Sequence, residues 1–193
     1  MSTLPSTAPT WYRQRSPAPP SRPPLTGQVE AEVCVVGGGL AGLATVLGLA
    51  ERGCPAVLLE GGRFGDGASG RNGGMVSGGF AMPTERLARI AGESDTRELY
   101  RRSQEAMALI RRRIETHAIP CDPTEGVVVA SFFDTPEALA ESAADHNARF
   151  GSRLEFWPRE RLHELYPSPR YCDGLYDPDG FHLNPLALCR GYA

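Results

Sequence analysis

The chain has 193 residues and a formal net charge of −3 at pH 7. A domain needs roughly 100–200 residues, and the 41% hydrophobic content can supply a core, so we expect one folded domain or slightly more. All 20 basic residues are arginines, which excludes a lysine-dependent phosphate loop and Schiff-base chemistry. The near-neutral charge argues against nucleic acid as a partner. No apolar run reaches the about 20 residues that a membrane span requires.

Residues 1–28 are rich in proline and contain no acidic residue. The prolines forbid a continuous helix, so we expect a disordered or extended leader rather than an amphipathic transit peptide. Trp11 and Tyr12 are the only large apolar side chains that could anchor it. The five cysteines form no C-x-x-C pair and no signal peptide precedes them, which predicts reduced thiols in a cytoplasmic protein.

A strand–turn–helix–strand pattern begins after the leader. Residues 32–36 form a short β-branched run typical of a buried strand, and the glycine-rich turn 37–42 follows it directly. Small and apolar residues then recur at helical spacing over 43–52, and residues 56–60 form a second strand that ends on an acid. This order predicts a βαβ unit.

The rest of the chain alternates loops, helices and short strands. The glycine-dense stretch 61–79 cannot hold a regular helix, so its backbone either passes close to something or is a mobile loop. We expect helices over 95–117, 135–150 and 159–165, strands over 126–133 and 154–156, a hairpin turn at 177–180, and a helix that begins after Asn184. On the first of these helices the spacing predicts the ion pairs Glu98–Arg102 and Arg111–Glu115.

The glycine turn has the context that dinucleotide binding requires. Gly37 permits the tight turn, Gly39 allows a pyrophosphate to approach the backbone, and Gly42 lets the helix pack close to the strand. The first helical amides, those of Leu40 and Ala41, face the phosphates. Glu60 lies about 20 residues further on and would accept hydrogen bonds from a ribose diol while repelling a 2′-phosphate. This favours FAD or NAD(H) over NADP(H).

Three strings of residues carry a resemblance to a known family. They are Val-Val-Gly-Gly-Gly-Leu-Ala-Gly-Leu from Val35, Leu-Leu-Glu-Gly-Gly-Arg from Leu58, and Gly-Ala-Ser-Gly-Arg-Asn-Gly-Gly from Gly67. The chain resembles the FAD-dependent D-amino-acid oxidase superfamily, and most closely the branch that contains gamma-glutamylputrescine oxidoreductase. The third string is the most specific, and a nicotinamide dehydrogenase would usually have another helix and strand at that place.

The resemblance implies an α/β fold, with a Rossmann-type FAD-binding βαβ unit followed by part of an α+β substrate domain. It implies that Gly62 and Arg63 lie on the adenine side, and that the stretch from Ala68 to Gly74 runs beside the ribityl chain and the isoalloxazine. The residues of that stretch assigned to FAD are Ala68, Ser69, Arg71, Asn72, Gly73 and Gly74. Met75 departs from the family pattern, where a polar residue such as Gln is common.

The resemblance also implies the chemistry. The carbon–nitrogen bond of an amine or amino acid is oxidised by hydride transfer to the flavin, the imine is hydrolysed, and O2 or another acceptor takes the electrons. No catalytic base can be named from the sequence, although His182 is a weak candidate. The remaining histidines have no spacing that indicates a metal site.

Alternatives remain open at this point. The chain could be a non-catalytic, truncated flavoprotein, or an NAD-dependent dehydrogenase, which the glycine loop after Glu60 disfavours. We expect three regions: a leader over 1–28, the FAD-binding unit and flavin-side loop over 29–82, and a partial substrate region over 83–193. Two Rossmann-type strands and an ending inside a helix predict an N-terminal fragment that is inactive alone.

Overall fold

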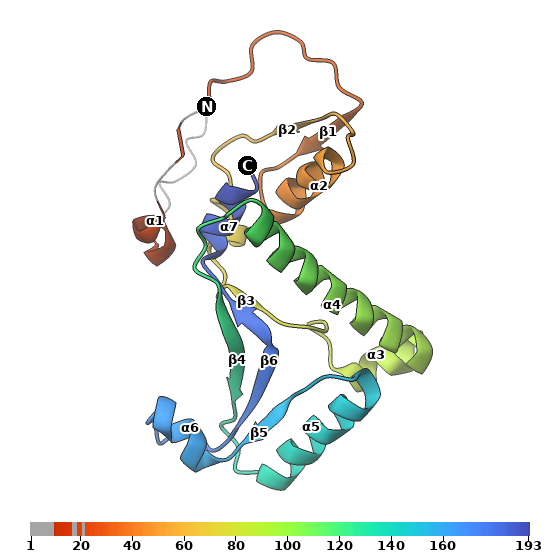
Figure 1. Cartoon of the computed structure of the whole chain (residues 1–193), viewed down its shortest axis with the longest axis vertical. Coiled ribbons are helices and arrows are strands. Elements are labelled where there is room, and N and C mark those ends of the chain that lie inside the picture. Colours follow the sequence, from red (N-terminus) through yellow and green to blue (C-terminus); the bar gives the residue numbers. More distant parts are fainter. Residues whose placement is uncertain (1–9, 17–18, 21) are drawn as a thin grey trace. The chain divides into compact units, whose positions relative to one another are not determined.

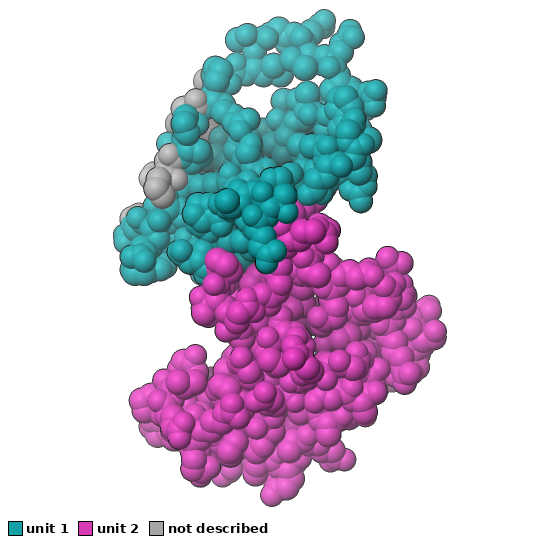
Figure 2. Space-filling view, viewed as in Figure 1, with its two compact units in different colours: residues 1–74, 114–122, 183–193 teal, residues 75–113, 123–182 magenta. Residues whose placement is uncertain are grey.

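The computed structural model describes residues 10–16, 19–20 and 22–193, and its chain forms two compact units. Figure 1 traces the elements along the chain and Figure 2 colours the two units. Unit 1 comprises residues 1–74, 114–122 and 183–193, whereas unit 2 comprises 75–113 and 123–182. Each unit therefore combines segments that are distant in the sequence. The predicted division after residue 82 stays a prediction.

Unit 1 contains the expected βαβ unit. Strands β1 (Val33–Val36) and β2 (Ala56–Leu59) pair in parallel, and helix α2 (Leu40–Ala50) connects them. The prediction that the first strand is buried is wrong, because Val33 and Val35 are half-buried while Cys34 and Val36 are exposed. The physical reason is that alternate side chains of a strand point to opposite faces of the sheet, and the face with Cys34 and Val36 is left uncovered in the described chain.

Two further helices belong to unit 1. Helix α1 (Trp11–Arg15) lies in the region expected to be extended or disordered, and Thr10 caps it by accepting a hydrogen bond from the Arg13 amide. Helix α7 (Pro185–Gly191) begins as predicted, because the Asn184 side chain accepts a hydrogen bond from the Ala187 amide and proline occupies the first turn. Five residues of α7 are buried, so this short helix forms much of the core of unit 1.

Unit 2 is built around a four-stranded antiparallel sheet. Strand β6 (Gly174–His182) pairs with β4 (Thr124–Ala130) along its length. On its other edge β6 pairs with β5 (Glu155–Trp157) at one end and with the short β3 (Met75–Val76) at the other. The core of the unit includes Phe181 and Leu162, both of which are fully buried.

The hairpin predicted at 177–180 is wrong, because β6 continues through these residues. Val127 pairs with Asp177 and Glu125 pairs with Phe181, so four steps along β6 face two steps along β4. The extra residues form a bulge, which accommodates Pro178 because a bulged residue needs no ladder hydrogen bond. The Asp177 carboxylate accepts the Asp179 amide within the bulge.

Four further helices have all or most of their residues in unit 2. They are α3 (Thr84–Ala91), α4 (Glu93–Thr116), α5 (Pro136–Phe150) and α6 (Arg159–Leu165), and the bounds of α5 and α6 agree closely with the prediction. None of the helices in the described part of the chain is long and apolar enough to cross a membrane.

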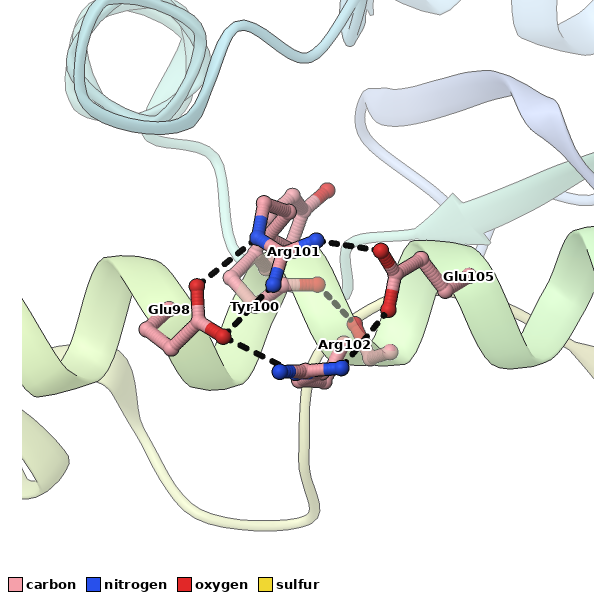
Figure 3. A network of polar contacts seen from close by, with 6 residues as sticks. Glu98, Tyr100, Arg101, Arg102 and Glu105 are labelled. Carbon is pink, nitrogen blue, oxygen red and sulfur yellow. Dashed lines mark hydrogen bonds and ion pairs between the residues drawn. The ribbon is translucent and has the colours of Figure 1, made fainter.

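Helix α4 carries an exposed network of ion pairs, shown in Figure 3. Glu98 pairs with Arg101 at 2.6 Å and with Arg102 at 2.8 Å, which confirms the predicted Glu98–Arg102 pair. Hydrogen bonds from the two guanidinium groups hold the pKa of Glu98 at about 2. The predicted Arg111–Glu115 pair is wrong: Arg111 instead pairs with Glu125 of β4 and lies over the Phe181 ring at 4.0 Å.

Candidate dinucleotide site

The glycine turn lies between β1 and α2, and Gly39 is the N-cap residue of the helix. A Cβ atom on Gly42 would lie 2.0 Å from the carbonyl oxygen of Gly37, so the first helical turn packs directly against the backbone that leaves β1. No side chain fits there. The close packing brings the amides of the first turn of α2, which have no intrahelical acceptor, to the end of the strand.

Glu60 joins the end of β2 to this turn. One carboxylate oxygen accepts the Gly38 amide at 2.6 Å, and the other accepts the Gly62 amide at 2.7 Å. The side chain is exposed, and each carboxylate oxygen can accept a second hydrogen bond. Glu60 is therefore held in position by backbone amides and can still accept hydroxyl groups from a ligand.

Ser69 approaches the turn from the glycine-rich loop. It lies in the single-turn helix η1 (Ala68–Gly70), and its hydroxyl oxygen accepts the Leu40 amide at 2.9 Å. A Cβ atom on Gly39 would lie 3.0 Å from the same oxygen. Three of the sequence-predicted segments, around Gly39, Glu60 and Ser69, are thus brought together in one unit.

The sequence left open whether the backbone of the glycine-rich loop passes close to something or forms a mobile loop. In the structure this backbone passes close to its surroundings. A Cβ atom on Gly70 would lie 2.2 Å from the carbonyl oxygen of Gly65 and 2.8 Å from the Leu186 side chain. One on Gly65 would lie 2.8 Å from Cβ of Cys189. The backbone of this loop therefore passes directly over helix α7.

The other predicted residues of the loop differ in what they contact. The Asn72 amide group donates to the Ala68 and Ser69 carbonyls, and its oxygen accepts the Gly74 amide, so its side chain holds the loop together. Arg63 and Arg71 are exposed. Gly62 is the residue whose amide binds Glu60, while Ala68 and Gly73 are exposed within the loop.

His182 lies in unit 2, at the end of β6, and all the other predicted site residues lie in unit 1. It pairs with Met75 on one side and with Thr124 on the other, and the three residues are exposed. Cross-strand partners share a face of the sheet. His182 and Met75, both singled out in the sequence, are therefore neighbours.

Sequence reasoning missed two features of the site. A Cβ atom on Gly38 would lie 2.3 Å from the Phe64 ring, so this glycine is constrained although it falls outside the G-x-G-x-x-G positions. Asp66 forms an ion pair with Arg13 at 2.5 Å, and the two residues are 53 positions apart. No local pattern in the sequence could indicate that pair.

Unit 1 contains two buried thiols, and one of them, Cys189, lies beside the loop. Burial raises the pKa of Cys189 to about 11, and it raises the pKa of Cys121 to the same value. Both thiols are fully buried and stay protonated at neutral pH. All five cysteines are free in the structure.

A parallel βαβ unit with a glycine turn, and an acid after its second strand, defines a Rossmann-type dinucleotide-binding fold. Residues 32–193 match the family model described as FAD dependent oxidoreductase, DAO. The chain belongs to this family. Its fold is that of part of such a flavoprotein domain.

Three known proteins illustrate the relationship. The chain is 36% identical to the "probable oxidoreductase OrdL" of Haemophilus influenzae over 89% of its length, and 35% identical to the gamma-glutamylputrescine oxidoreductase of Escherichia coli over 88%. It spans 40% of the length of each of these relatives. The crystal structure of glycine oxidase from Bacillus cereus matches 85% of the chain and 43% of its own length, with a TM-score of 0.59 at 21% identity.

The residues at the turn fit the dinucleotide portion of FAD. Gly39 leaves the approach to the first turn of α2 without a Cβ atom, and the helix N-terminus favours negative charge there. The Glu60 carboxylate is held by the Gly38 and Gly62 amides, and its oxygens can accept further hydrogen bonds. The amides of Gly37, Gly38 and Leu40 donate within the protein, to Leu59, Glu60 and Ser69, so the remaining amides of the turn are those of Gly39, Ala41 and Gly42.

Proposed function

We propose that this chain provides the dinucleotide-binding part of an FAD-dependent oxidoreductase that oxidises the carbon–nitrogen bond of an amine or amino acid. The observation that carries the proposal is the double hydrogen bond of Glu60 to the glycine turn, which orients an acceptor beside the helix N-terminus. The substrate class is supported by the names of two similar proteins, gamma-glutamylputrescine oxidoreductase and glycine oxidase.

The proposed roles follow the three segments of the site. The turn from Gly37 to Gly42 holds the diphosphate through those backbone amides that do not already donate to other residues of the protein, and Glu60 accepts the ribose hydroxyls. The loop from Ala68 to Gly74 runs beside the ribityl chain and the isoalloxazine, with Arg71 available to balance charge. Gly62 and Arg63 border the adenine.

FAD, when bound, supplies the two-electron acceptor chemistry that no amino-acid side chain provides. The protein's own contribution is to bind and orient the cofactor and substrate and to exclude water. The imine product would be hydrolysed by water, and O2 or another acceptor would take the electrons. His182 remains a candidate catalytic residue, and no proton transfer is assigned to it. The free cysteines support a cytoplasmic location.

We also propose a division of the chain into three regions, as the sequence predicts. We retain 29–82 as the FAD-binding unit with its flavin-side loop and 83–193 as part of a substrate region, preceded by a leader over 1–28. One point qualifies this division: residues 183–193 pack in unit 1, beside the flavin-side loop.

The experiment is a titration of FAD with the purified chain, followed by flavin fluorescence. We expect saturable binding, and we expect Glu60→Gln to weaken it about tenfold, which corresponds to about 1.4 kcal/mol. Glutamine offers one acceptor where Glu60 uses two, so its NH2 group would face a backbone N–H. The matched control is Glu32→Gln, another exposed glutamate of unit 1 that precedes β1.

Equal FAD affinities for the wild type and Glu60→Gln would contradict the proposed site. Tighter binding of NAD⁺ than of FAD would instead favour the dehydrogenase alternative. A chain that binds neither nucleotide at any accessible concentration would overturn the cofactor proposal for this unit.

A further inference from the structure

Helix α1 contacts the glycine-rich loop through an ion pair. The Arg13 guanidinium lies 2.5 Å from one carboxylate oxygen of Asp66, and the two side chains are only 23% and 22% exposed. The other carboxylate oxygen of Asp66 is buried and has no hydrogen-bond partner among the described residues. Partial burial makes the Asp66 charge costly without a cation beside it.

Ser16, directly after α1, joins the N-terminal arm (residues 10–16) to helix α7. Its side chain is buried, and its hydroxyl oxygen accepts the Asn184 side-chain amide at 2.8 Å. Its carbonyl oxygen accepts a hydrogen bond from the Arg190 guanidinium at 2.6 Å. Asn184 also caps α7, so one side chain links the start of this helix to the N-terminal arm.

The arm thus reaches the loop in two ways. Arg13 contacts it directly through Asp66, and Ser16 contacts it indirectly through α7, on which Gly65 and Gly70 pack. Further along, the Arg22 guanidinium lies 5.4 Å from the centre of the Phe64 ring, and Phe64 covers Gly38 of the glycine turn. Of the two apolar side chains predicted to anchor the leader, Trp11 is exposed and Tyr12 is half-buried, while the contacts of Arg13 and Ser16 are polar.

Asp66 lies three positions before Ser69, whose hydroxyl contacts the first turn of α2. Gly65, on its other side, donates its amide to the Gly38 carbonyl at 2.9 Å. Asp66 therefore lies between two points where the loop contacts the glycine turn, at Gly65 and at Ser69. A force that fixes Asp66 also fixes Gly65 and, through η1, Ser69.

We propose that Arg13 is a positioning residue for FAD: by neutralising and holding Asp66, the N-terminal arm keeps the loop 61–74 in the conformation in which Ser69 meets the glycine turn. This inference rests on the proposed function for its consequence on FAD affinity. Its structural part, the dependence of the loop on Arg13, does not rest on it. The two parts can therefore be tested separately.

The first measurement is hydrogen–deuterium exchange of the chain without FAD. We expect Arg13→Gln to speed exchange several-fold in peptides covering 61–74 and at the Leu40 amide, which donates to Ser69, because the loop loses its contact with the arm. The rest of α2 should exchange as in the wild type. The matched control is Arg15→Gln on the same helix, an exposed arginine that lies over Trp11 rather than on the loop. Equal exchange of the loop in both variants would overturn the proposal, whether or not FAD binds.

The second measurement is FAD affinity by fluorescence titration in a double-mutant cycle. We expect Arg13→Gln and Asp66→Asn each to weaken binding about tenfold, and the double variant to be no weaker than either one, because both remove one interaction. Arg13→Lys, which keeps the charge, should restore most of the affinity, and Arg15→Gln should bind as the wild type does. Additive losses, or no rescue by lysine, would overturn the role of the ion pair.

The two measurements separate the possible failures. Faster loop exchange in Arg13→Gln without any FAD binding by the wild type would refute the proposed cofactor site and leave the link between arm and loop supported. Normal FAD binding by Arg13→Gln would refute the positioning role and leave the proposed function intact.

Discussion

Cys121 and Cys189 illustrate how burial acts on single residues of this protein. Both are fully buried in unit 1, and burial raises the pKa of each thiol to about 11. An unfolded chain would release these protons near the ordinary thiol pKa of about 8.5. The folded state therefore binds the thiol protons more tightly than the unfolded state does.

This difference predicts a pH dependence of stability. The contribution of the two thiols is fully present below the unfolded pKa and is lost as the pH rises from about 8.5 toward about 11. Urea unfolding across this range should give a falling free energy of unfolding, and Cys189→Ala should make the decline shallower. Cys34→Ala is the control, because Cys34 is exposed. An equal slope in the wild type and Cys189→Ala would contradict the expectation.

At the scale of elements, the contact between the loop 61–74 and α7 gives the next prediction. Gly70→Ala should destabilise the chain by about 1–3 kcal/mol, because the added methyl group overpacks the site. It would lie 2.2 Å from the carbonyl oxygen of Gly65. Gly67→Ala is the matched control, since nothing lies within 4 Å of its added Cβ. Thermal unfolding measures both.

The same two variants should also differ in their affinity for FAD. Gly70→Ala should also weaken FAD binding more than Gly67→Ala does, because the loop shifts away from the glycine turn. If Gly67→Ala proved as damaging as Gly70→Ala, loop entropy rather than close packing would explain the glycines, and our account of the loop would be wrong.

The elements also indicate how far the sequence could predict this fold. Helix α5, helix α6 and the capped start of α7 were predictable because caps, prolines and periodicity act within a few residues. The segment Asp177–Gly180 has the composition of a turn, yet pairing with β4 holds it inside β6 as a bulge. Turn propensity is local, and a long partner strand outweighs it.

The residues of the candidate site could likewise be predicted only in part. The glycine turn and Glu60 follow from spacing, because a βαβ unit fixes their positions relative to each other. The Arg13–Asp66 pair could not be predicted, because 53 positions separate the two residues and neither has a distinctive neighbour. The partner of Arg111 was mispredicted for a related reason: helical spacing describes neighbours on α4 but not those on the sheet.

At the scale of the whole molecule, unit 1 contains only a two-stranded parallel sheet among its described residues. Val36 is 82% exposed, and Cys34 and Leu59 are also exposed. Small open sheets of this kind have unpaired edges and marginal independent stability. We therefore expect the dinucleotide site to be less rigid in this chain than in relatives of more than twice its length.

The consequence is weak retention of FAD. The purified chain should contain far less than one flavin per protein after gel filtration, and it should not oxidise amines, although FAD added in excess should still bind. Visible absorbance of the purified protein and peroxide production with amine substrates measure the two expectations. A flavin content near stoichiometry would refute the first.

Unit 1 is built from segments that are far apart in the sequence, and this has a consequence during synthesis. The loop around Gly65 and Gly70 packs on Leu186 and Cys189, residues that the ribosome adds more than a hundred positions later. Contacts so distant in the sequence form slowly and late. The nascent glycine turn therefore emerges with its neighbouring loop uncovered, and that loop can reach its native packing only after residues 183–191 have left the exit tunnel.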